Sequence, residues 1–321
     1  PGGRPVATAE AVREDFAGPA PGTGVRLEAR RLALAVGRRR LRLSGPARLE
    51  GLPVTIEATQ EIRPAGARTA RISRRLDAEL LGRLGLDGSL ALTGGTGEAT
   101  LTLSRAGPGA APRLSVAARF DAPALHVEGV GRLKPEGAPG ALSARLVPGA
   151  DSALAVEDLA LAAGDLAVEG RLELGPGGRL RRAVLDRVAL GEALDVAATA
   201  EPAEGRGWRA TVEGPWLDLP GLAAHLEADA APGDAGGDMA RPDPDAPRLE
   251  ARTRLARVRV AEGFDLHDAE GRLLREAGAA ALRAELRGRV NGGVAGRLAF
   301  RARQGRRPRL TLRSPDAGRD R

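Results

Sequence analysis

The stretch LAVEDLALAAGDLAVEGRLEL, residues 154–174, decides the class of fold that this sequence can adopt. Within it, large aliphatic residues recur at every second position in short runs, and Ala, Asp, Glu or Arg stands between them. These aliphatic residues are Leu154, Val156, Leu159, Leu161, Leu166, Val168, Leu172 and Leu174. Because successive side chains of a β-strand point to opposite faces, the pattern predicts strands with one apolar face, opposite Asp165 and Glu169.

The same alternation extends along most of the chain on both sides of this stretch. It recurs at Leu32 and Leu34, Leu41 and Leu43, Val54 and Ile56, Leu90 and Leu92, Leu101 and Leu103, and Leu114 and Val116. Turn-forming Gly, Pro and Asp residues separate the strands, and almost no amphipathic segment of helix length lies between them. Parallel strands need such crossovers, so the sequence predicts an antiparallel meander.

Two turns and one helix are predicted within this meander. Asn291-Gly292 suits a type I′ hairpin turn because both residues tolerate positive φ, and residues 175–178, GPGG, separate another pair of strands. Residues 73–84, SRRLDAELLGRL, place leucines on one helical face, with Ser73 as a candidate N-cap and Gly85 just past the end. The expected fold is therefore mainly β, with one short helix near 73–84.

Composition divides the chain into strand-rich regions and polar segments. Residues 1–24 mix Pro, Gly and charge, which is typical of a linker or an incomplete edge, and residues 25–229 carry the alternating strands. Residues 230–247 repeat Pro, Gly and Asp and hold few apolar side chains, which predicts a disordered linker or long loop. The alternation resumes over residues 248–313, and residues 314–321 are a polar end.

Cysteine content and charge argue against several classes of function. The sequence has no Cys, which excludes a disulfide framework, a thiolate metal site and a cysteine nucleophile. The formal net charge is +7, but Asp and Glu stand between the arginines nearly everywhere, and Lys134 is the only lysine. Such a mixed surface, with few aromatic side chains on which bases could stack, argues against a nucleic-acid partner.

No motif points to catalysis or to a bound cofactor. His126, His225 and His267 are far apart in the sequence, and none stands in a helical metal-ligand spacing. No Ser is framed as a nucleophile by G-x-S-x-G or S-x-x-K. Residues 94–97, GGTG, lack the Lys and Ser or Thr of a phosphate loop and lie between alternating strands, where a hairpin turn explains them better. We therefore expect a protein that is not an enzyme and binds no cofactor or metal.

The apolar face of such strands must be covered by a second sheet, a helix layer or a ligand. One alternative is the closed core of a β-sandwich. The other is an elongated, curved sheet whose apolar inner face forms a groove for acyl chains. Burial of a methylene group contributes about 0.8 kcal/mol, so a sixteen-carbon chain would gain about 12 kcal/mol. The aliphatic residues of 154–174 are the candidate groove residues, and periodicity alone leaves both alternatives open.

Short stretches that follow one another beyond residue 40 carry a family resemblance. They are ARLEGLPVTIEA (47–58), RISRRLDAELLGRLGLDGSLALTGG (71–95), VGRLKPEGAPGALSARL (130–146), GWRATVEGPWLDLPGL (207–222) and LTLRSPDAG (310–318). In this order they resemble the YhdP-like branch of the AsmA-like proteins, the bridge-like lipid-transport proteins of the Gram-negative envelope. The resemblance rests on the succession of the stretches and carries over no catalytic residue.

The resemblance implies an internal or C-terminal fragment of a longer protein anchored in the inner membrane, and a chain that begins at Pro1 fits that expectation. The implied β-groove would shield phospholipid acyl chains in the periplasm on their way to the outer membrane. The implied partners are those acyl chains, membranes contacted through other parts of the parent chain, and envelope proteins. Two alternatives stay open: a TamB-like assembly factor for outer-membrane proteins, and a periplasmic β-sandwich that binds protein partners.

Overall fold

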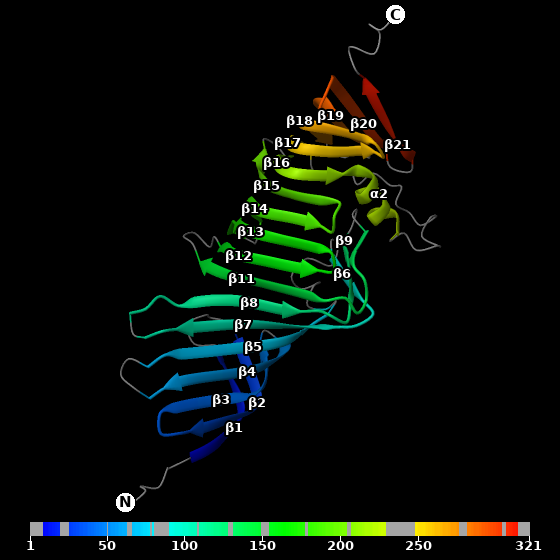
Figure 1. Cartoon of the computed structure of the whole chain (residues 1–321). Helices are drawn as coiled ribbons and strands as arrows, with labels where there is room; N and C mark the ends of the chain where they lie inside the picture. Colours follow the sequence, from blue (N-terminus) through cyan, green and yellow to red (C-terminus); the bar gives the residue numbers. More distant parts are fainter. Residues whose placement is uncertain are drawn as a thin grey trace, which may run out of the picture. The chain divides into compact units, whose positions relative to one another are not determined.

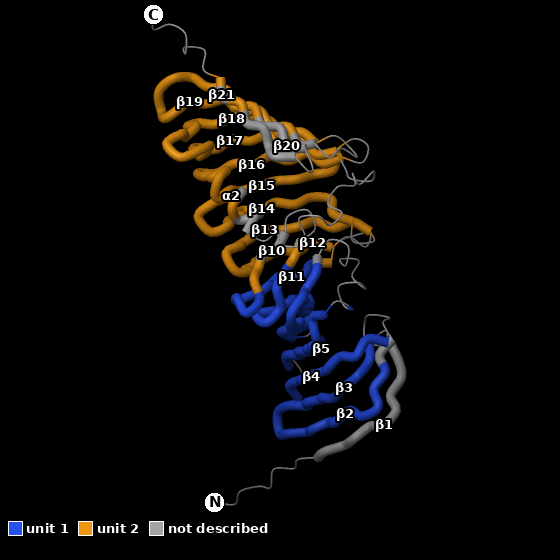
Figure 2. The backbone as a smooth tube through the Cα atoms, turned by 90° about the vertical axis from the view of Figure 1, so that its right-hand side faces the viewer, with its two compact units in different colours: residues 1–125, 136–147 blue, residues 126–135, 148–321 orange. Residues whose placement is uncertain are grey.

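The computed structural model describes residues 9–19, 26–49, 51–62, 66–77, 79, 90–107, 109–127, 131–148, 154–176, 179–203, 207–228, 248–275, 281–303 and 306–313. Strands predominate among them, so the mainly β fold is confirmed (Figure 1). The chain divides into two compact units (Figure 2). Unit 1 comprises residues 1–125 and 136–147, and unit 2 comprises residues 126–135 and 148–321. The division falls within 25–229, where composition marks no boundary.

Unit 1 is built on an antiparallel meander. Its strands are β1 (Ala9–Pro19), β2 (Arg26–Val36), β3 (Arg40–Leu49), β4 (Leu52–Glu61), β5 (Arg68–Leu76), β7 (Gly97–Arg105), β8 (Arg113–Arg119) and β11 (Gly140–Pro148). Each strand pairs antiparallel with the next one in this order. The short strands β6 (Leu90–Thr93), β9 (Ala124–Val127) and β10 (Gly131–Lys134) lie outside this meander.

The strand register keeps the apolar residues of unit 1 on one face. One row of directly opposed residues crosses β4, β5, β7, β8 and β11, and consists of Ile56, Ile72, Leu101, Val116 and Ala144. On β2 to β4 a cluster of buried side chains covers the same face, formed by Ala29, Leu32, Ala47, Val54 and Ile56. Side chains of neighbouring strands on one face contact each other, and such pairs stabilise the sheet.

Unit 2 contains a second, longer meander in which the strands follow one another in chain order. They are β12 (Leu154–Ala163), β13 (Leu166–Leu174), β14 (Leu180–Leu190), β15 (Leu194–Ala203), β16 (Gly207–Asp218), β17 (Arg248–Ala261), β18 (Phe264–Arg275), β19 (Ala281–Val290), β20 (Ala295–Arg303) and β21 (Arg306–Arg313). Successive strands pair antiparallel, with the exception of β16 and β17. The prediction of a meander thus holds on either side of one parallel pair.

The parallel pair β16–β17 is connected by a helix that the apolar periodicity does not predict. Helix α2 (Leu219–Ala228) follows β16 directly, and parallel strands need such a crossover. Asp218 caps the helix, because its Oδ1 accepts a hydrogen bond of 3.1 Å from the backbone N–H of Gly221. The local sequence Asp218-Leu219-Pro220 carries a signal for this start, an N-cap followed by a Pro in the first turn.

Bulges bend the strands of unit 2. Register shifts fall between Val156 and Leu159 in β12 and between His267 and Glu270 in β18. Within them, Asp158 has a φ of 50° and Asp268 a φ of 51°. An extra residue on one strand of a pair bends that strand and increases its twist, so these bulges give the sheet its curvature.

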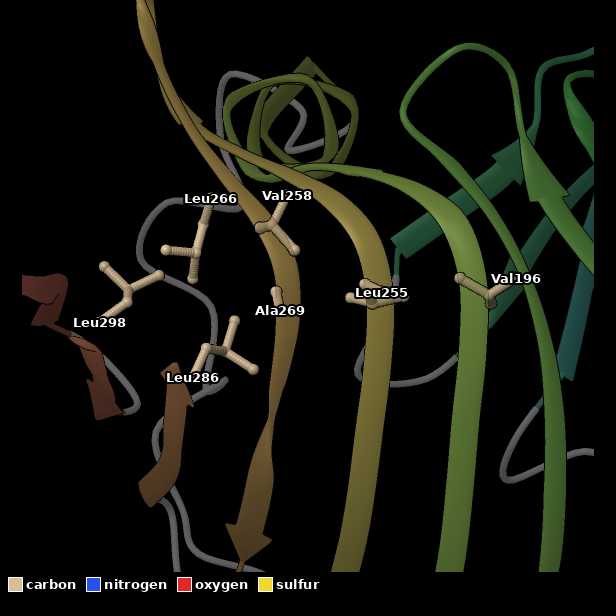
Figure 3. Packing of buried hydrophobic residues seen from close by; sticks show 7 residues of the cluster. All are labelled: Val196, Leu255, Val258, Leu266, Ala269, Leu286 and Leu298. Carbon is tan, nitrogen blue, oxygen red and sulfur yellow. The ribbon is translucent and has the colours of Figure 1, made fainter. Parts of the chain in front are cut away.

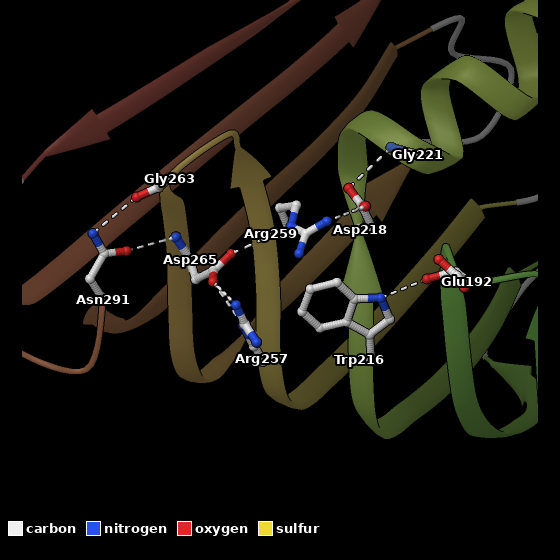
Figure 4. A network of polar contacts seen from close by, with 9 residues as sticks. All are labelled: Glu192, Trp216, Asp218, Gly221, Arg257, Arg259, Gly263, Asp265 and Asn291. Atoms are coloured by element: carbon white, nitrogen blue, oxygen red, sulfur yellow. Dashed lines mark hydrogen bonds and ion pairs between the residues drawn. The ribbon is translucent and has the colours of Figure 1, made fainter.

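A polar network holds the parallel pair together at the edge where β16 ends (Figure 4). The guanidinium carbons of Arg257 and Arg259 on β17 each lie 4.9 Å from the ring centroid of Trp216 on β16. The indole Nε1 of Trp216 donates a hydrogen bond of 2.7 Å to the backbone oxygen of Glu192. Arg259 also pairs with Asp218, with 3.2 Å between Nη1 and Oδ2. Cation–π contacts and ion pairs therefore join β17 to the strand before it.

The predicted turn at Asn291-Gly292 is confirmed between β19 and β20. Both residues have positive φ, 48° for Asn291 and 75° for Gly292, as a type I′ turn requires. The Asn291 side chain also binds the neighbouring β17–β18 turn. Its Nδ2 donates to the backbone oxygen of Gly263 at 3.0 Å, and its Oδ1 accepts from the N–H of Asp265 at 2.9 Å (Figure 4).

Two local predictions are wrong. Residues 73–76 continue strand β5 rather than beginning a helix, and the Oγ of Ser73 lies 3.1 Å from Thr100 Oγ1 on β7. Pairing of β5 with both β4 and β7 outweighs the helical spacing of the leucines, and Ser73 caps no helix. The GGTG turn at 94–97 does not close a hairpin, because β7 pairs with β5 and β8 instead of β6.

Several predicted segments lie outside the described residues. They are part of the predicted helix, at 78 and 80–84, the linker at 230–247, the polar end at 314–321, and parts of 1–24. Glu79, between two such segments, has helical conformation, and residues 9–19 of the first segment form the edge strand β1.

Gly170 lies where strands β13 and β14 come close together at a bulge. A Cβ atom at this position would lie 2.2 Å from the backbone oxygen of Val184 and 2.7 Å from the Cα of Leu185. We expect Gly170→Val to lower the free energy of unfolding by about 2–3 kcal/mol, because the backbone of β14 would have to move. Ala160→Val, on the exposed face of β12, should stay within about 0.5 kcal/mol of the unmodified protein. Urea unfolding of both variants measures the difference, and equal midpoints would contradict the close approach.

Candidate functional site

The predicted groove residues lie on one face of the sheet of unit 2. Between β12 and β13 the directly opposed pairs are Leu154 with Leu174, Val156 with Leu172, Leu159 with Gly170, and Leu161 with Val168, and Ala163 faces Leu166. Directly opposed residues of an antiparallel pair point to the same side. The bulge after Val156 adds one residue, so the aliphatic residues before and after it share that side although their spacing changes from two to three.

This apolar face continues across the later strands of unit 2. One row of opposed residues runs from β12 to β19 and consists of Val156, Leu172, Ala183, Ala200, Ala210, Ala251, Leu273 and Ala284. A second row, on β12 to β15, consists of Leu161, Val168, Val188 and Val196. We call this surface the apolar face of unit 2. Asp165, expected opposite the leucines, lies in the β12–β13 turn, and Glu169 lies on the other face.

The apolar face is only partly covered over β12 and β13. Val156 and Leu166 are buried, whereas the remaining candidate groove residues are half-buried, namely Leu154, Leu159, Leu161, Val168, Leu172 and Leu174. On the apolar face of unit 1, Leu103 is 39% exposed. The half-buried aliphatic side chains of β12 and β13 are therefore partly accessible to an apolar ligand.

One part of the same face, on β15 and on β17 to β20, is buried. Figure 3 shows the cluster of Val196, Leu255, Val258, Leu266, Ala269, Leu286 and Leu298, with helix α2 close by. Val258 is 0% exposed and Leu266 is 1% exposed, and Leu219 at the start of α2 packs against the cluster. Here the chain itself covers the apolar face, which forms an ordinary core.

Two polar side chains stand on the otherwise apolar face. The register places Thr253 opposite Val212 and Gly271, and Arg275 opposite Leu249. The Thr253 Oγ1 is buried and has no hydrogen-bond partner among the residues that the structure describes. Because burial of an unpaired hydroxyl costs free energy, Thr253 lowers the stability of this core.

The opposite face of the sheet carries charge. Arg254 on β17 lies between two carboxylates, with 3.0 Å from its Nε to Glu270 and 3.8 Å from its Nη1 to Glu213. Arg187 and Asp195 pair at 3.4 Å between β14 and β15. All of these side chains are well exposed, so each ion pair contributes about 0–1 kcal/mol to the free energy of unfolding. Their main effect is to make this face hydrophilic.

The three histidines of the sequence do not come together in the described part of the structure. His126 on β9 and His267 on β18 are half-buried, and His225 belongs to α2. Within the described ranges, no group of three or more His, Asp or Glu side chains could hold a metal ion. The longest described helix segment, α2, is neither long nor apolar enough to cross a membrane, and the same holds for any other described helix.

In comparisons with protein-family models, with curated proteins and with solved structures, no match to this chain is found. The AsmA-like resemblance therefore stays a prediction from the sequence, and the function has to be inferred from the apolar face itself.

The open and closed parts of the apolar face should respond differently to truncation. We expect Leu266→Ala to lower the free energy of unfolding by about 3 kcal/mol, because the buried cluster cannot fill the cavity. Leu161→Ala should cost about 1 kcal/mol, since its side chain is half-buried. Denaturant unfolding measures both values. Equal losses would mean that the face over β12 is as closed as the cluster beneath α2.

Proposed function

We propose that this chain is a non-enzymatic segment of an envelope protein that shields phospholipid acyl chains during transport between the inner and outer membranes. The observation that carries the proposal is the apolar face of unit 2, continuous from strand to strand and half-exposed over β12 and β13. The resemblance to the AsmA-like proteins supports the compartment, which would be the periplasm, and an anchor in the inner membrane from other parts of the parent chain.

The energetics favour acyl chains as the ligand. A half-exposed row of Leu and Val offers no hydrogen bond and no charge, so it selects for apolar partners. Each methylene group transferred from water to this face would contribute about 0.8 kcal/mol, which makes the whole tail of a phospholipid the dominant source of affinity. The charged opposite face would keep the loaded sheet soluble.

A second candidate, a β-sheet whose apolar face binds a protein partner, is favoured by the closed cluster beneath α2. In that part of unit 2 the face is covered by protein, and a partner could cover β12 and β13 in the same way. A TamB-like role in outer-membrane protein assembly belongs to this class. The two candidates differ in what contacts Leu161.

Site-specific photo-crosslinking distinguishes them. A benzophenone amino acid at position 161 should crosslink phospholipid in bacterial cells, whereas the same group at position 160, on the exposed opposite face of β12, should not. Lipid is detected by mass spectrometry of the purified protein. Crosslinks from position 161 to proteins alone would favour the second candidate, and equal lipid labelling at both positions would contradict the assignment of the face.

Charge substitution tests the same face without a probe. Leu161→Arg should reduce the phospholipid that co-purifies with the protein several-fold, because a guanidinium would have to be desolvated beside the acyl chain. Ala160→Arg adds the same charge to the neighbouring residue on the polar face and should leave bound lipid unchanged. Both variants are compared at matched folded yield, measured by circular dichroism. Equal lipid content in the two variants would count against the groove.

A further inference from the structure

The polar face of unit 2 contains a hollow of about 680 Å³ that the lipid proposal does not use. It lies over β16 to β19 and is lined mainly by two rows of residues, with Thr253 and Gly271 between them. The first row is Thr211, Arg252, Arg272 and Glu285, and the second row is Glu213, Arg254, Glu270 and Arg287. In each row, neighbours in this order are directly opposed on adjacent strands.

The second row is electrostatically complementary. Acidic and basic residues alternate across the strands, and Arg254 forms ion pairs with the carboxylates on both sides of it. The like charges within the row are kept apart by a residue of the opposite sign. Such an arrangement needs no additional ligand.

The first row is complementary only at one end, where Arg272 is opposed to Glu285. Arg252 on β17 and Arg272 on β18 are directly opposed, and like charges in such a pair destabilise a sheet. Glu285, the next residue in the row, forms an ion pair with Arg297 on β20. Among the described residues, the structure shows no ion pair for Arg252, Arg272 or Arg287, although all three are exposed and line the hollow.

We propose that this hollow binds a phosphate group between Arg252 and Arg272. Guanidinium groups present two parallel N–H donors to phosphate oxygens, and a phosphate placed between the two arginines would replace their repulsion by two charge-assisted contacts. The hydroxyl of Thr211, which is opposed to Arg252 in the same row, offers a further donor at the end of the site.

The lining also indicates the size and kind of ligand. None of the described lining residues is aromatic, so the hollow offers no stacking surface for a base. The hollow has room for a phosphate-bearing group such as pyrophosphate or a glycerophosphate head group together with water. The shared chemistry is a phosphate group, and its source is either a free phosphate compound or the head group of an anionic lipid.

Thermal unfolding tests the site. Pyrophosphate should raise the Tm of the unmodified protein by about 3 °C at ten times its dissociation constant, relative to sodium chloride at the same ionic strength. The double variant Arg252→Gln/Arg272→Gln should lose this shift. In chloride alone it should be at least as stable as the unmodified protein, because the repulsion between the two arginines is gone.

The control is Arg171→Gln/Arg209→Gln, which removes the same charge from β13 and β16 of the same face outside the hollow and should retain the shift. Vesicles of phosphatidylcholine with and without phosphatidylglycerol separate the two sources. Binding that requires phosphatidylglycerol and Arg272 identifies a lipid head group, and a pyrophosphate shift without such binding identifies a free phosphate compound.

The proposal is overturned if neither pyrophosphate nor phosphatidylglycerol has an effect on the unmodified protein, or if the control variant loses the effect equally. A double variant that is less stable in chloride than the unmodified protein would also overturn it, since it would show that the arginine pair is not under repulsion. Because the hollow and the apolar face are on opposite sides of the sheet, failure here would leave the lipid proposal standing.

Discussion

The structure of unit 2 depends on one geometric constraint: each strand must keep its large aliphatic side chains on one side while the sheet bends. Side chains alternate strictly along a strand, so a bend made by inserting one residue would send every later side chain to the wrong side. The sequence meets this constraint by shifting its own spacing. Val156 and Leu159 are three residues apart, and the extra residue, Asp158, occupies the bulge with a positive φ. Curvature and apolar pattern are therefore encoded together.

The same face serves two purposes along the strands. Under α2 the side chains of Val258 and Leu266 are fully enclosed, and their burial supplies stability. Over β12 and β13 most of the aliphatic residues are half-buried and contribute less to folding than their number suggests. Because the chain itself does not fully bury these side chains, this part of the face is the candidate binding surface.

The sequence was sufficient for the strands and for the face, and insufficient where tertiary pairing or local capping decides. Alternation predicted the strands of 154–174, and the tolerance of Asn and Gly for positive φ predicted the turn at Asn291-Gly292, because both depend on neighbouring residues. It failed at Ser73, where two partner strands outweigh a helical spacing. It also missed α2, whose signal is only the cap at Asp218 and a following proline, and the hollow beside Arg252 and Arg272, because opposed positions on different strands are not visible before the register is known.

The parallel pairing of β16 and β17 has a consequence for how unit 2 assembles. In a meander each strand contacts only the strands before and after it, so order can spread hairpin by hairpin at low entropic cost. The pair β16–β17 cannot form in this way, because its partners are separated by a helix and a long connection whose ends must first be brought together. β12–β16 and β17–β21 are thus two locally folding groups of hairpins. The register of β16 with β17, the buried cluster that joins Val196 to Leu255, and the contacts of Trp216 with Arg257 and Arg259 close the boundary between them, so the cooperativity of the whole sheet depends on this one junction.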